Sequence, residues 1–430
     1  MNDLAGKRVL VWGIGRHGGG LAAARFCHEQ GAVVRLLDRT PVAELGPDGA
    51  EAARWPCATG GAGHPWLTES DLIVASPAIP PRAWPDQHAP VTCPEGLFFA
   101  HHRGPRLAVT GTKGKSTTAR IAGALLGWPV AGNSYEPLLD LYRRLGPDTP
   151  VVCELSSFQL WYLREQCPRF AAAILTTLGR DHLDWHPDIA HYEASKLALF
   201  TWVEATVTAP ALVPRLPAGA RALPPVVCTD GIFAAMDGGT LATRADLGLL
   251  GDHNADNAGL AIAAALHLGL DPALVKERLR TVRPLPHRLQ TVHRAGGLSF
   301  IDDSIATTPE SAMAGLAAVS GPLAVILGGS DKGATWEALA AAVLRRGASA
   351  VTMGTTGPAI AAAVRAAGGE PSEAEDIEVA VAYAGAWLRG AGTVLLSPAC
   401  ASFDRFRGFE HRGDCFAAAA KALFPVATPS

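Results

Sequence analysis

Residues 107–118 read LAVTGTKGKSTT, and this stretch decides the fold expected for the middle of the chain. Its apolar start predicts a buried strand, its Gly/Lys/Thr segment predicts a loop, and residues 117–126 predict a helix. Glycines let backbone N–H groups approach phosphate oxygens, and a helix N-terminus adds partial positive charge. The stretch therefore predicts a phosphate-binding loop in which Lys115 reaches the β- and γ-phosphates and Ser116 or Thr117 ligates Mg²⁺. Val109 stands where the usual motif has its first glycine, so a strand–helix turn without a ligand is the alternative.

The composition bounds the class of protein. A chain of 430 residues predicts about two to four domains, and 48% hydrophobic residues suffice for large cores. The net charge of −3, with no basic block, disfavours nucleic-acid binding. There is neither a signal-peptide pattern nor an apolar run of membrane-spanning length, and the eight cysteines include no C-x-x-C pair. We therefore expect a cytoplasmic protein without structural zinc, disulfides or a membrane partner.

A second glycine-rich turn lies near the N-terminus. Residues 7–12 (KRVLVW) predict a buried strand that runs into the G-x-G-x-x-G pattern of residues 13–18. A helix over 21–30 and a strand over 32–37 follow, and Asp38 comes next, about 20 positions after the glycines. This is the start of a Rossmann βαβ unit. A ligand such as NAD, another nucleotide diphosphate, or a tight turn without a ligand all fit the pattern.

Three polar side chains follow predicted strands of the middle region. Glu154 lies at the carboxyl end of the strand 151–155, where ligands bind in open α/β sheets. The pattern alone fits a helix cap or a surface acid equally well. His182 follows the strand 171–175, and lone histidines are more often structural than ligating. Lys196 lies on a predicted helix over 189–200, where it is either a desolvated lysine with a lowered pKa or an ordinary solvated one.

The remaining elements favour further α/β structure. Strands are predicted over 206–213 and 226–228, and helices over 251–267 and 271–280. Two proline-bounded stretches, 92–94 and 284–288, are candidate linkers. The last region predicts a parallel or mixed sheet with polar loops at its strand ends. Its expected strands are 298–301, 323–327, 348–353 and 393–396.

These loops match one known family across nearly the whole chain. The matching stretches are TGTKGKSTT from Thr110, ELSSFQL from Glu154, DHLDWH from Asp181, GDHNADN from Gly251, LPHR from Leu285, DDSIATT from Asp302, GGSDKG from Gly328 and LLSPACASFDRFRGFEHRGDCF from Leu395. The chain resembles the Mur ligases, and within them the subfamily that adds D-glutamate.

The resemblance implies an α/β chain of three domains. Residues 1–92 would form a Rossmann-like domain that binds the UDP part of the substrate rather than NAD. Residues 93–285 would form a central P-loop-type ATPase sheet for ATP and Mg²⁺, and residues 286–430 a second Rossmann-like domain for the amino acid.

The activity implied is a ligation in peptidoglycan synthesis. ATP would activate UDP-N-acetylmuramoyl-L-alanine as an acyl phosphate, and D-glutamate would attack it, giving ADP and phosphate. We expect a cytoplasmic monomer with small-molecule substrates. The alternatives are the same ligation with L-glutamate, another Mur or folylpolyglutamate ligase, an NAD-dependent oxidoreductase, and a non-catalytic nucleotide-binding module.

By the same resemblance, each substrate has a set of residues. The catalytic residues would be Lys115, Glu154, His182 and Lys196. Two Mg²⁺ ions would be held by Ser116, Glu154, His182 and Lys196, the last as a carbamate. ATP would contact Gly111, Thr112, Lys113, Gly114, Lys115, Ser116, Thr117, Asn254, Asn257, His287, Arg288 and Asp303. The UDP substrate would contact Gly15, Arg16, His17, Asp38, Arg39, Asn133 and Ser157. Glutamate would contact Thr307, Lys332, Ser402 and Phe409.

Two positions depart from the family pattern. Ile305 stands where the family often has a lysine that meets the amino acid. Ser-Tyr-Glu follows Asn133, where the family usually has Ile-Gly. Both departures leave room for altered selectivity, including toward L-glutamate.

Overall fold

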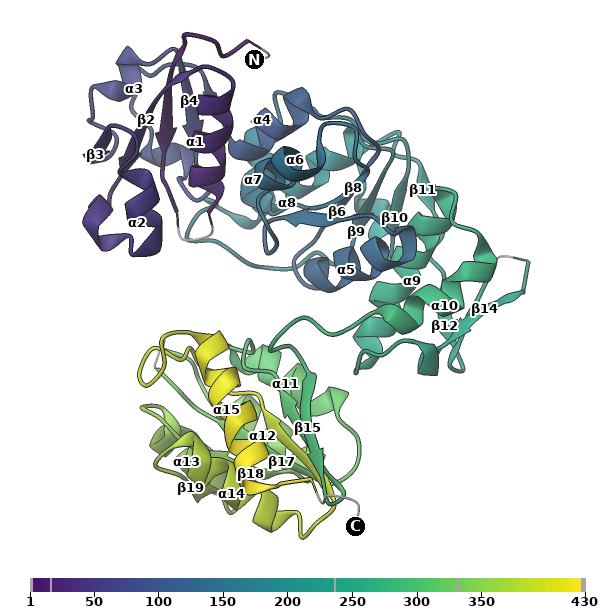
Figure 1. Cartoon of the computed structure of the whole chain (residues 1–430). Helices are drawn as coiled ribbons and strands as arrows, with labels where there is room; N and C mark the ends of the chain where they lie inside the picture. The colour runs from purple at the N-terminus through teal and green to yellow at the C-terminus, as the bar shows by residue number, and fades with distance from the viewer. Residues whose placement is uncertain (1–2, 16–17, 236, 331–332, 427–430) are drawn as a thin grey trace. The chain divides into compact units, whose positions relative to one another are not determined.

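The computed structural model describes residues 3–15, 18–235, 237–330 and 333–426. The chain divides into two compact units, one of residues 1–247 with 255–282 and one of residues 248–254 with 283–430 (Figure 1). Each unit is an α/β structure with helices packed on its sheets, as the sequence predicts. Helices formed by the described residues are all too short or too polar to cross a bilayer.

The first unit begins with a parallel sheet in the order β3-β2-β1-β4-β5. Its strands are Cys57–Thr59, Val33–Asp38, Arg8–Trp12, Leu72–Ala75 and Val91–Thr92. Helix α1 (Gly19–Glu29) follows the glycine turn and begins two residues earlier than predicted. Gly13 has a φ of 85°, and a Cβ there would lie 2.8 Å from the Cβ of Ser76, so only glycine fits this turn.

The predicted linker at 92–94 is shorter than expected, because helix α4 (Pro94–His101) starts there. The Sγ of Cys93 caps this helix by accepting a hydrogen bond from the backbone N–H of Gly96. Proline is tolerated at the first helical position because it lacks a backbone N–H, and an N–H at that position would have no partner within the helix.

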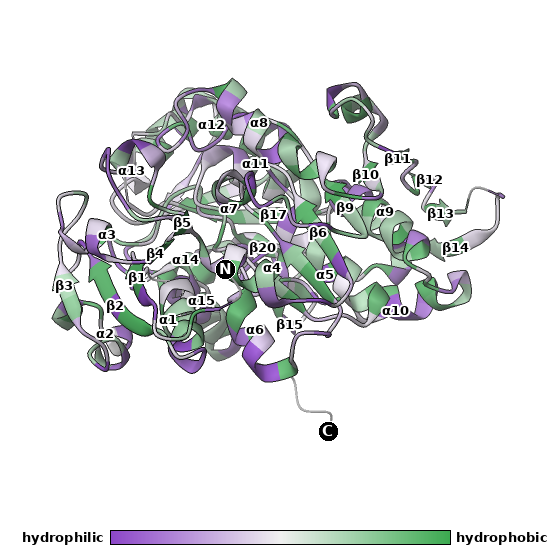
Figure 2. Cartoon of the chain, turned by 90° about the horizontal axis from the view of Figure 1, so that it is seen from above, coloured by the Kyte–Doolittle hydropathy of each residue, from purple (hydrophilic) through white to green (hydrophobic). Residues whose placement is uncertain are grey.

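The second sheet of this unit has the order β11-β10-β9-β6-β8-β7. Its central strand is β6 (Arg106–Thr110), flanked by β8 (Val151–Glu154) and β9 (Ala172–Leu175), all parallel. The outer strands are β7 (Val130–Gly132), β10 (Thr206–Thr208) and β11 (Ala222–Leu223). Strand β6 is largely hydrophobic (Figure 2), and its residues 107–110 are fully buried. Because the strands are parallel, the loops after β6, β8 and β9 emerge at one edge of the sheet.

The prediction of a strand over 206–213 is wrong beyond Thr208. Residues Pro210–Arg215 form a 3-10 helix instead. Proline has no N–H for a sheet ladder, and this segment contains two prolines, at 210 and 214. The strand expected over 226–228 begins only at Cys228, as β12 (Cys228–Thr229) of a small antiparallel sheet with β13 (Ile232–Ala234) and β14 (Thr240–Thr243).

Helices α5 (Lys115–Leu126), α6 (Leu138–Leu145), α7 (Ser157–Leu163) and α8 (Ile189–Leu197) alternate along the chain with the strands of the second sheet. Helices α9 (Asp252–His267) and α10 (Val275–Thr281) follow the small antiparallel sheet, and α10 packs against α5 and β14. Helix α5 begins at Lys115, so the two residues before the predicted start already belong to its first turn. The predicted helix over 271–280 begins instead as a short 3-10 turn, Pro272–Leu274.

The second unit holds a mixed sheet in the order β15-β16-β20-β17-β18-β19. Its strands are Gln290–Ala295, Leu298–Asp302, Gly392–Leu396, Leu323–Leu327, Ser349–Thr352 and Ser372–Glu373. Strands β15 and β16 form an antiparallel hairpin, and the other pairs are parallel. The two edge strands were not predicted, because β15 is only partly buried and β19 is two exposed residues long. The covering helices are α11 (Pro309–Ala318), α12 (Glu337–Arg346), α13 (Gly357–Ala366), α14 (Ile377–Trp387) and α15 (Phe409–Leu423).

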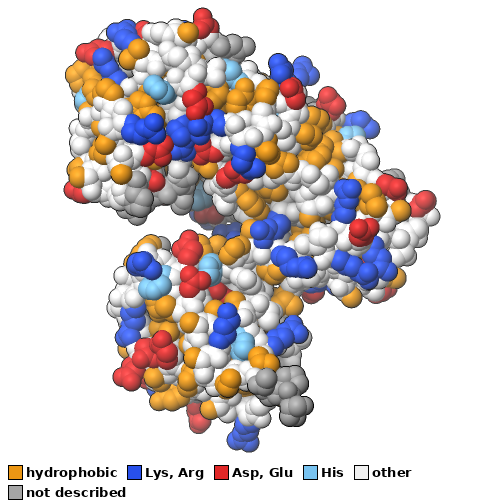
Figure 3. Space-filling model, in the orientation of Figure 1, with side chains coloured by type: hydrophobic (Ala, Val, Ile, Leu, Met, Phe, Trp, Pro, Cys, Tyr) orange, Lys and Arg blue, Asp and Glu red, His pale blue; other side chains and the backbone are white. Residues whose placement is uncertain are grey.

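Charged side chains are distributed over the surface. On the face shown in Figure 3, Lys and Arg are interspersed with Asp and Glu. Within the first unit, the guanidinium of Arg25 pairs with Glu51 and Asp140 at 2.8 Å each. This pairing joins the α1 region to α6 within the first unit.

Candidate active site

The glycine-rich loop after β6 is held in place by the threonines that follow β9. The backbone N–H of Thr112 donates to the carbonyl of Thr177 at 2.8 Å, and the N–H of Lys113 donates to the Oγ1 of Thr177 at 2.8 Å. Gly111 has a positive φ of 149°, and a Cβ there would lie 2.0 Å from the Oγ1 of Thr176. The loop conformation therefore depends on glycine at this position.

Two lysine ammonium groups meet at this loop. The Nζ of Lys115 donates to the carbonyl of Gly111 at 2.9 Å and to that of Thr112 at 3.1 Å. The Nζ of Lys196, from α8, donates to the same Gly111 carbonyl at 2.9 Å. Lys196 is only 1% exposed, and burial, reinforced by Lys115, lowers its pKa well below the usual value. Lys115 thus places positive charge where a phosphate would lie, whereas the buried Lys196 amine is easily deprotonated.

Glu154 ends β8 and is fully buried beside the loop. Its Oε1 accepts hydrogen bonds from the Oγ of Ser116 (3.0 Å), the Nδ2 of Asn133 (3.0 Å) and the Oγ of Ser134 (3.3 Å). Its Oε2 is also buried, and no described residue gives it a hydrogen bond. A buried carboxylate oxygen without a partner, next to a serine hydroxyl, suits Mg²⁺, which prefers oxygen ligands. Asn133, which we expected at the UDP substrate, contacts this carboxylate.

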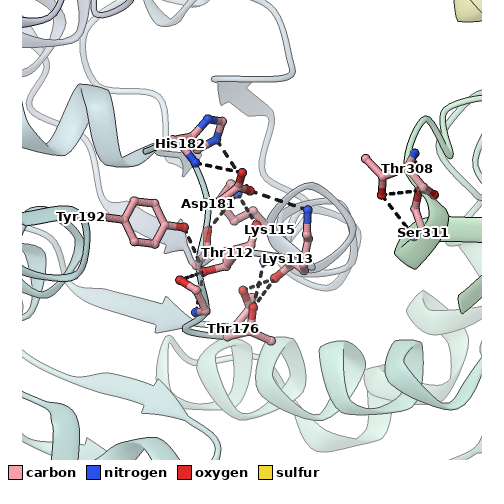
Figure 4. Close-up of polar contacts among 12 residues, drawn as sticks. Thr112, Lys113, Lys115, Thr176, Asp181, His182, Tyr192, Thr308 and Ser311 are labelled. Atoms are coloured by element: carbon pink, nitrogen blue, oxygen red, sulfur yellow. Dashed lines mark hydrogen bonds and ion pairs between the residues drawn. The ribbon is translucent and has the colours of Figure 1, made fainter. Parts of the chain in front are cut away.

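His182 lies in the loop after β9, in a left-handed backbone conformation with a φ of 53°. Its Nε2 is 3.8 Å from the Oδ2 of Asp181, which is also 3.6 Å from the Nζ of Lys113 (Figure 4). Partial burial lowers the pKa of His182, and Lys196 adds to this although Asp181 opposes it. A neutral imidazole can ligate a metal, but over the described residues no three His, Cys, Asp or Glu side chains converge as a metal-binding group.

The loop that carries His182 is hydrogen-bonded to the segment that follows β4 in the first sheet of the same unit. The Nη1 of Arg82 donates to the carbonyl of Trp185 at 2.6 Å, and its Nη2 donates to the carbonyl of Asp184. In return, the indole Nε1 of Trp185 donates to the carbonyl of Pro77 at 3.0 Å. The segment after β4 of the first sheet and the loop after β9 of the second sheet are therefore hydrogen-bonded to each other.

A buried chain of hydrogen bonds next to this loop was not predicted. The Oγ of Ser157 lies 2.9 Å from the Nε2 of His186, whose Nδ1 lies 2.8 Å from the Nδ1 of His191. Burial is the main cause that lowers the pKa of His186, to about 4, so this ring is neutral near pH 7. Ser157, expected at the UDP substrate, is thus held by a histidine. His186 lies within the stretch DHLDWH, and its place in that stretch was the only signal in the sequence.

The carboxylate of Asp38 accepts hydrogen bonds from the backbone on both sides, including the glycine turn of the first sheet. The Oδ2 of Asp38 accepts from the N–H of Ile14 at 2.7 Å, and its Oδ1 accepts from the N–H of Thr40 at 2.9 Å. Gly15 has a φ of 73° and Arg39 is exposed. The predicted residues Arg16 and His17 lie outside the described residues.

Helix α9 carries the two predicted asparagines, and both are largely buried. A Cβ on Gly114 would lie 2.6 Å from the Oδ1 of Asn257, so the Asn257 side chain packs against the phosphate loop. The Nδ2 of Asn254 donates to the carbonyl of Leu250 at 2.6 Å.

In the second unit, predicted residues gather at the carboxyl ends of β16 and β20. The Nδ1 of His287 is 2.7 Å from the Oδ2 of Asp302. Asp303 accepts from the Oγ of Ser397 at 2.8 Å and from the N–H of Leu289 at 3.2 Å. Burial raises the pKa of Asp303 to about 7.

The residues expected to bind glutamate lie on neighbouring loops of this unit. Ser402 is buried, Thr307 is half-buried, and Phe409 begins helix α15. Arg288, predicted to contact ATP, is also half-buried. The carbonyl of Phe409 accepts a hydrogen bond from the Oγ of Ser304 at 2.8 Å. Lys332 lies outside the described residues.

Known proteins resemble this chain throughout its length. The Mur ligase middle domain matches residues 109–212, and the glutamate ligase domain of Mur ligases matches residues 287–400. The UDP-N-acetylmuramoylalanine–D-glutamate ligase of Pelotomaculum thermopropionicum is 34% identical over 97% of this chain and 98% of that protein. The UDP-N-acetylmuramoyl-L-alanine–L-glutamate ligase of a Micromonospora strain is 33% identical over 98% of each. The solved structure of the UDP-N-acetylmuramate-alanine ligase MurC from Thermotoga maritima has a TM-score of 0.62 at 19% identity, over 97% of this chain and 100% of that chain, which shows a shared fold.

Proposed function

Because this chain belongs to the Mur ligase family, we propose that it uses ATP to join D-glutamate to UDP-N-acetylmuramoyl-L-alanine in peptidoglycan synthesis. The observation that carries the proposal is the convergence of Lys115 and Lys196 on the carbonyl of Gly111. Burial and Lys115 lower the pKa of Lys196, and the carboxylates of Asp181 and Glu154 only partly oppose this shift. This arrangement combines the positive charge of Lys115 with an available carboxylate oxygen on Glu154, and transfer of a phosphoryl group between anions requires such a cation and a metal ligand.

The reaction needs activation because a carboxylate does not acylate an amine at neutral pH. An oxygen of the alanyl carboxylate attacks the γ-phosphorus of ATP, the bond to the β-γ bridging oxygen breaks, and ADP leaves. The amine of glutamate then attacks the acyl carbon, and phosphate leaves as the amine loses a proton. Lys115 and the loop N–H groups stabilise the charge on the phosphoryl oxygens during the first step.

Mg²⁺ fits the oxygens of Ser116 and Glu154, since the Oε2 of Glu154 is buried without a described partner. When bound, the ion would neutralise charge on the phosphates. We propose His182 as a ligand of a second Mg²⁺, and a carbamate on Lys196 as another. The lowered pKa of Lys196 supports this, because the neutral amine adds CO₂ and releases one proton.

The other substrates are assigned to the remaining predicted residues. We propose the UDP substrate at Gly15, Arg16, His17, Asp38, Arg39, Asn133 and Ser157, ATP also at Asn254, Asn257, His287, Arg288 and Asp303, and glutamate at Thr307, Lys332, Ser402 and Phe409. The domain boundaries 1–92, 93–285 and 286–430, a monomeric state and a cytoplasmic location are part of the same proposal.

The test is a ligation assay with each glutamate enantiomer. Purified protein is incubated with UDP-N-acetylmuramoyl-L-alanine, ATP and Mg²⁺, and both phosphate release and product mass are measured. We expect turnover with D-glutamate. Turnover with L-glutamate alone would reassign the amino acid, an outcome that Ile305 makes worth testing. Folded protein without turnover on either enantiomer would refute the proposal.

A further inference from the structure

A single buried arginine ties together three loops of the second unit. Arg412 lies in the first turn of α15 and is 1% exposed. Its Nε donates to the Oγ of Ser304 at 3.0 Å, and its Nη2 donates to the carbonyls of Ser304 and Cys400 at 2.9 Å each. Its Nη1 donates to the carbonyls of Ala401 at 3.3 Å and Gly328 at 3.5 Å.

These acceptors lie after three adjacent parallel strands. Ser304 follows β16, residues 400–401 follow β20, and Gly328 follows β17. Ligands of open α/β sheets bind at this edge, and the match to a glutamate ligase domain covers residues 287–400. The same loops carry Thr307 and Ser402, for which we propose contacts with glutamate.

The contacts of Arg412 are unlike those of an ordinary buried arginine. All its hydrogen-bond acceptors among the described residues are neutral carbonyls and one hydroxyl. Burial lowers its pKa to about 10, so the guanidinium stays charged near pH 7. A planar guanidinium has donors in several directions, which a lysine ammonium cannot direct at three loops at once.

The loops around Arg412 pack so closely that the backbone at Gly329 leaves no room for a side chain. A Cβ on Gly329 would lie 2.1 Å from the carbonyl oxygen of Ala401 and 3.0 Å from the Nη1 of Arg412. Ala399 holds a φ of 62°, which is uncommon for a residue with a Cβ. Arg412 donates to the carbonyls of Cys400 and Ala401, the two residues that follow Ala399.

We propose that Arg412 is a positioning residue of the amino-acid site, which fixes the spacing of the three loops that receive glutamate. The proposal rests on the function proposed above. If the spacing is lost, glutamate is misplaced while the phosphate loop, in the other unit, is untouched. A misplacement of about 1 Å can cost roughly 10²-fold in rate.

The test compares Arg412→Lys with a matched control, Arg346→Lys. Arg346 also donates to backbone carbonyls, those of Val319 (2.7 Å) and Gly321 (2.6 Å), near the start of β17. We expect Arg412→Lys to raise the KM for glutamate by about tenfold or more while the KM values for ATP and the UDP substrate change less than about twofold. We expect Arg346→Lys to leave all three KM values unchanged.

A second variant and a second readout keep the proposal testable if Arg412→Lys does not fold. Ser304→Ala removes one acceptor of Arg412 together with the hydrogen bond from Ser304 to the carbonyl of Phe409, and it leaves the carbonyl contacts of Arg412, so we expect a smaller rise in the KM for glutamate. Hydrogen exchange, which needs no turnover, should become faster in residues 303–308 and 397–403 of the Arg412 variant and not in 319–321. Equal changes in all three KM values, an unchanged KM for glutamate in folded Arg412→Lys, or unchanged exchange would overturn the proposal. A wild-type protein that shows no turnover would refute the proposed function instead, and exchange would still decide the loop role.

Discussion

Replacing Asp303 by asparagine should make the stability of the protein less dependent on pH. Asp303 is 5% exposed, and its carboxylate accepts hydrogen bonds from Ser397 and from the backbone of Leu289. Burial raises its pKa from an ordinary value of 3.8 to about 7. Asparagine keeps an oxygen acceptor in this place but never ionises.

The sign and size of the effect follow from linkage. At about pH 5 the folded protein holds the proton on Asp303, whereas the unfolded chain has already released it. The free energy of unfolding therefore falls as the pH rises from the unfolded pKa toward 7. Between about pH 5 and pH 8, a folded pKa of about 7 gives a loss of about 3 kcal/mol. This corresponds to roughly 6–12 °C in Tm for a unit of this size.

The assay is differential scanning calorimetry of the wild type and Asp303→Asn at both pH values. Asp414→Asn is the matched control, since it removes the same charge from an exposed position in the same unit. We expect the difference in Tm between wild type and Asp303→Asn to change by several degrees between the two pH values. Parallel pH dependences of these two proteins would refute the reasoning, because they would mean that Asp303 titrates alike in the folded and unfolded states.

Three other substitutions test the candidate active site. Glu154→Gln should weaken Mn²⁺ binding, measured by electron paramagnetic resonance, and lower kcat by roughly 10²–10³-fold, whereas the exposed Glu165→Gln should do neither. Gly111→Ala should abolish ATP binding in a fluorescence titration, because its Cβ would lie 2.0 Å from Thr176; normal binding would contradict the loop geometry. Lys196→Met should abolish ligation. It should also reduce the loss of stability that occurs as the pH falls below 10.5, because the unfolded chain takes up a proton at Lys196 there and the folded protein does not. Thermal unfolding at several pH values measures this, and an unchanged pH dependence would count against a desolvated amine.

Local sequence determined the elements that surround the phosphate loop. The apolar runs before Gly111, Glu154 and Thr176 each became a strand, because short runs of three or more apolar residues bounded by polar loops fit the interior of a parallel sheet. The resemblance to the Mur ligases, confirmed by the comparisons, also came from short motifs. Strand β15 was not predicted, and the strand predicted over 206–213 was extended too far, over residues 209–213. The side chains of both segments are only partly buried or exposed, so their hydrophobic pattern is weak.

Tertiary structure alone decided which of these residues have unusual chemistry. Nothing in the letters around Lys196 separates a solvated lysine from one that is 1% exposed and shares the carbonyl of Gly111 with Lys115. Nor do they show which oxygen of Glu154 lacks a partner, or that Arg412 reaches three loops. A strand pattern depends on neighbours in the chain, whereas burial, pKa and the pairing of donors with acceptors depend on atoms brought together from distant parts of it.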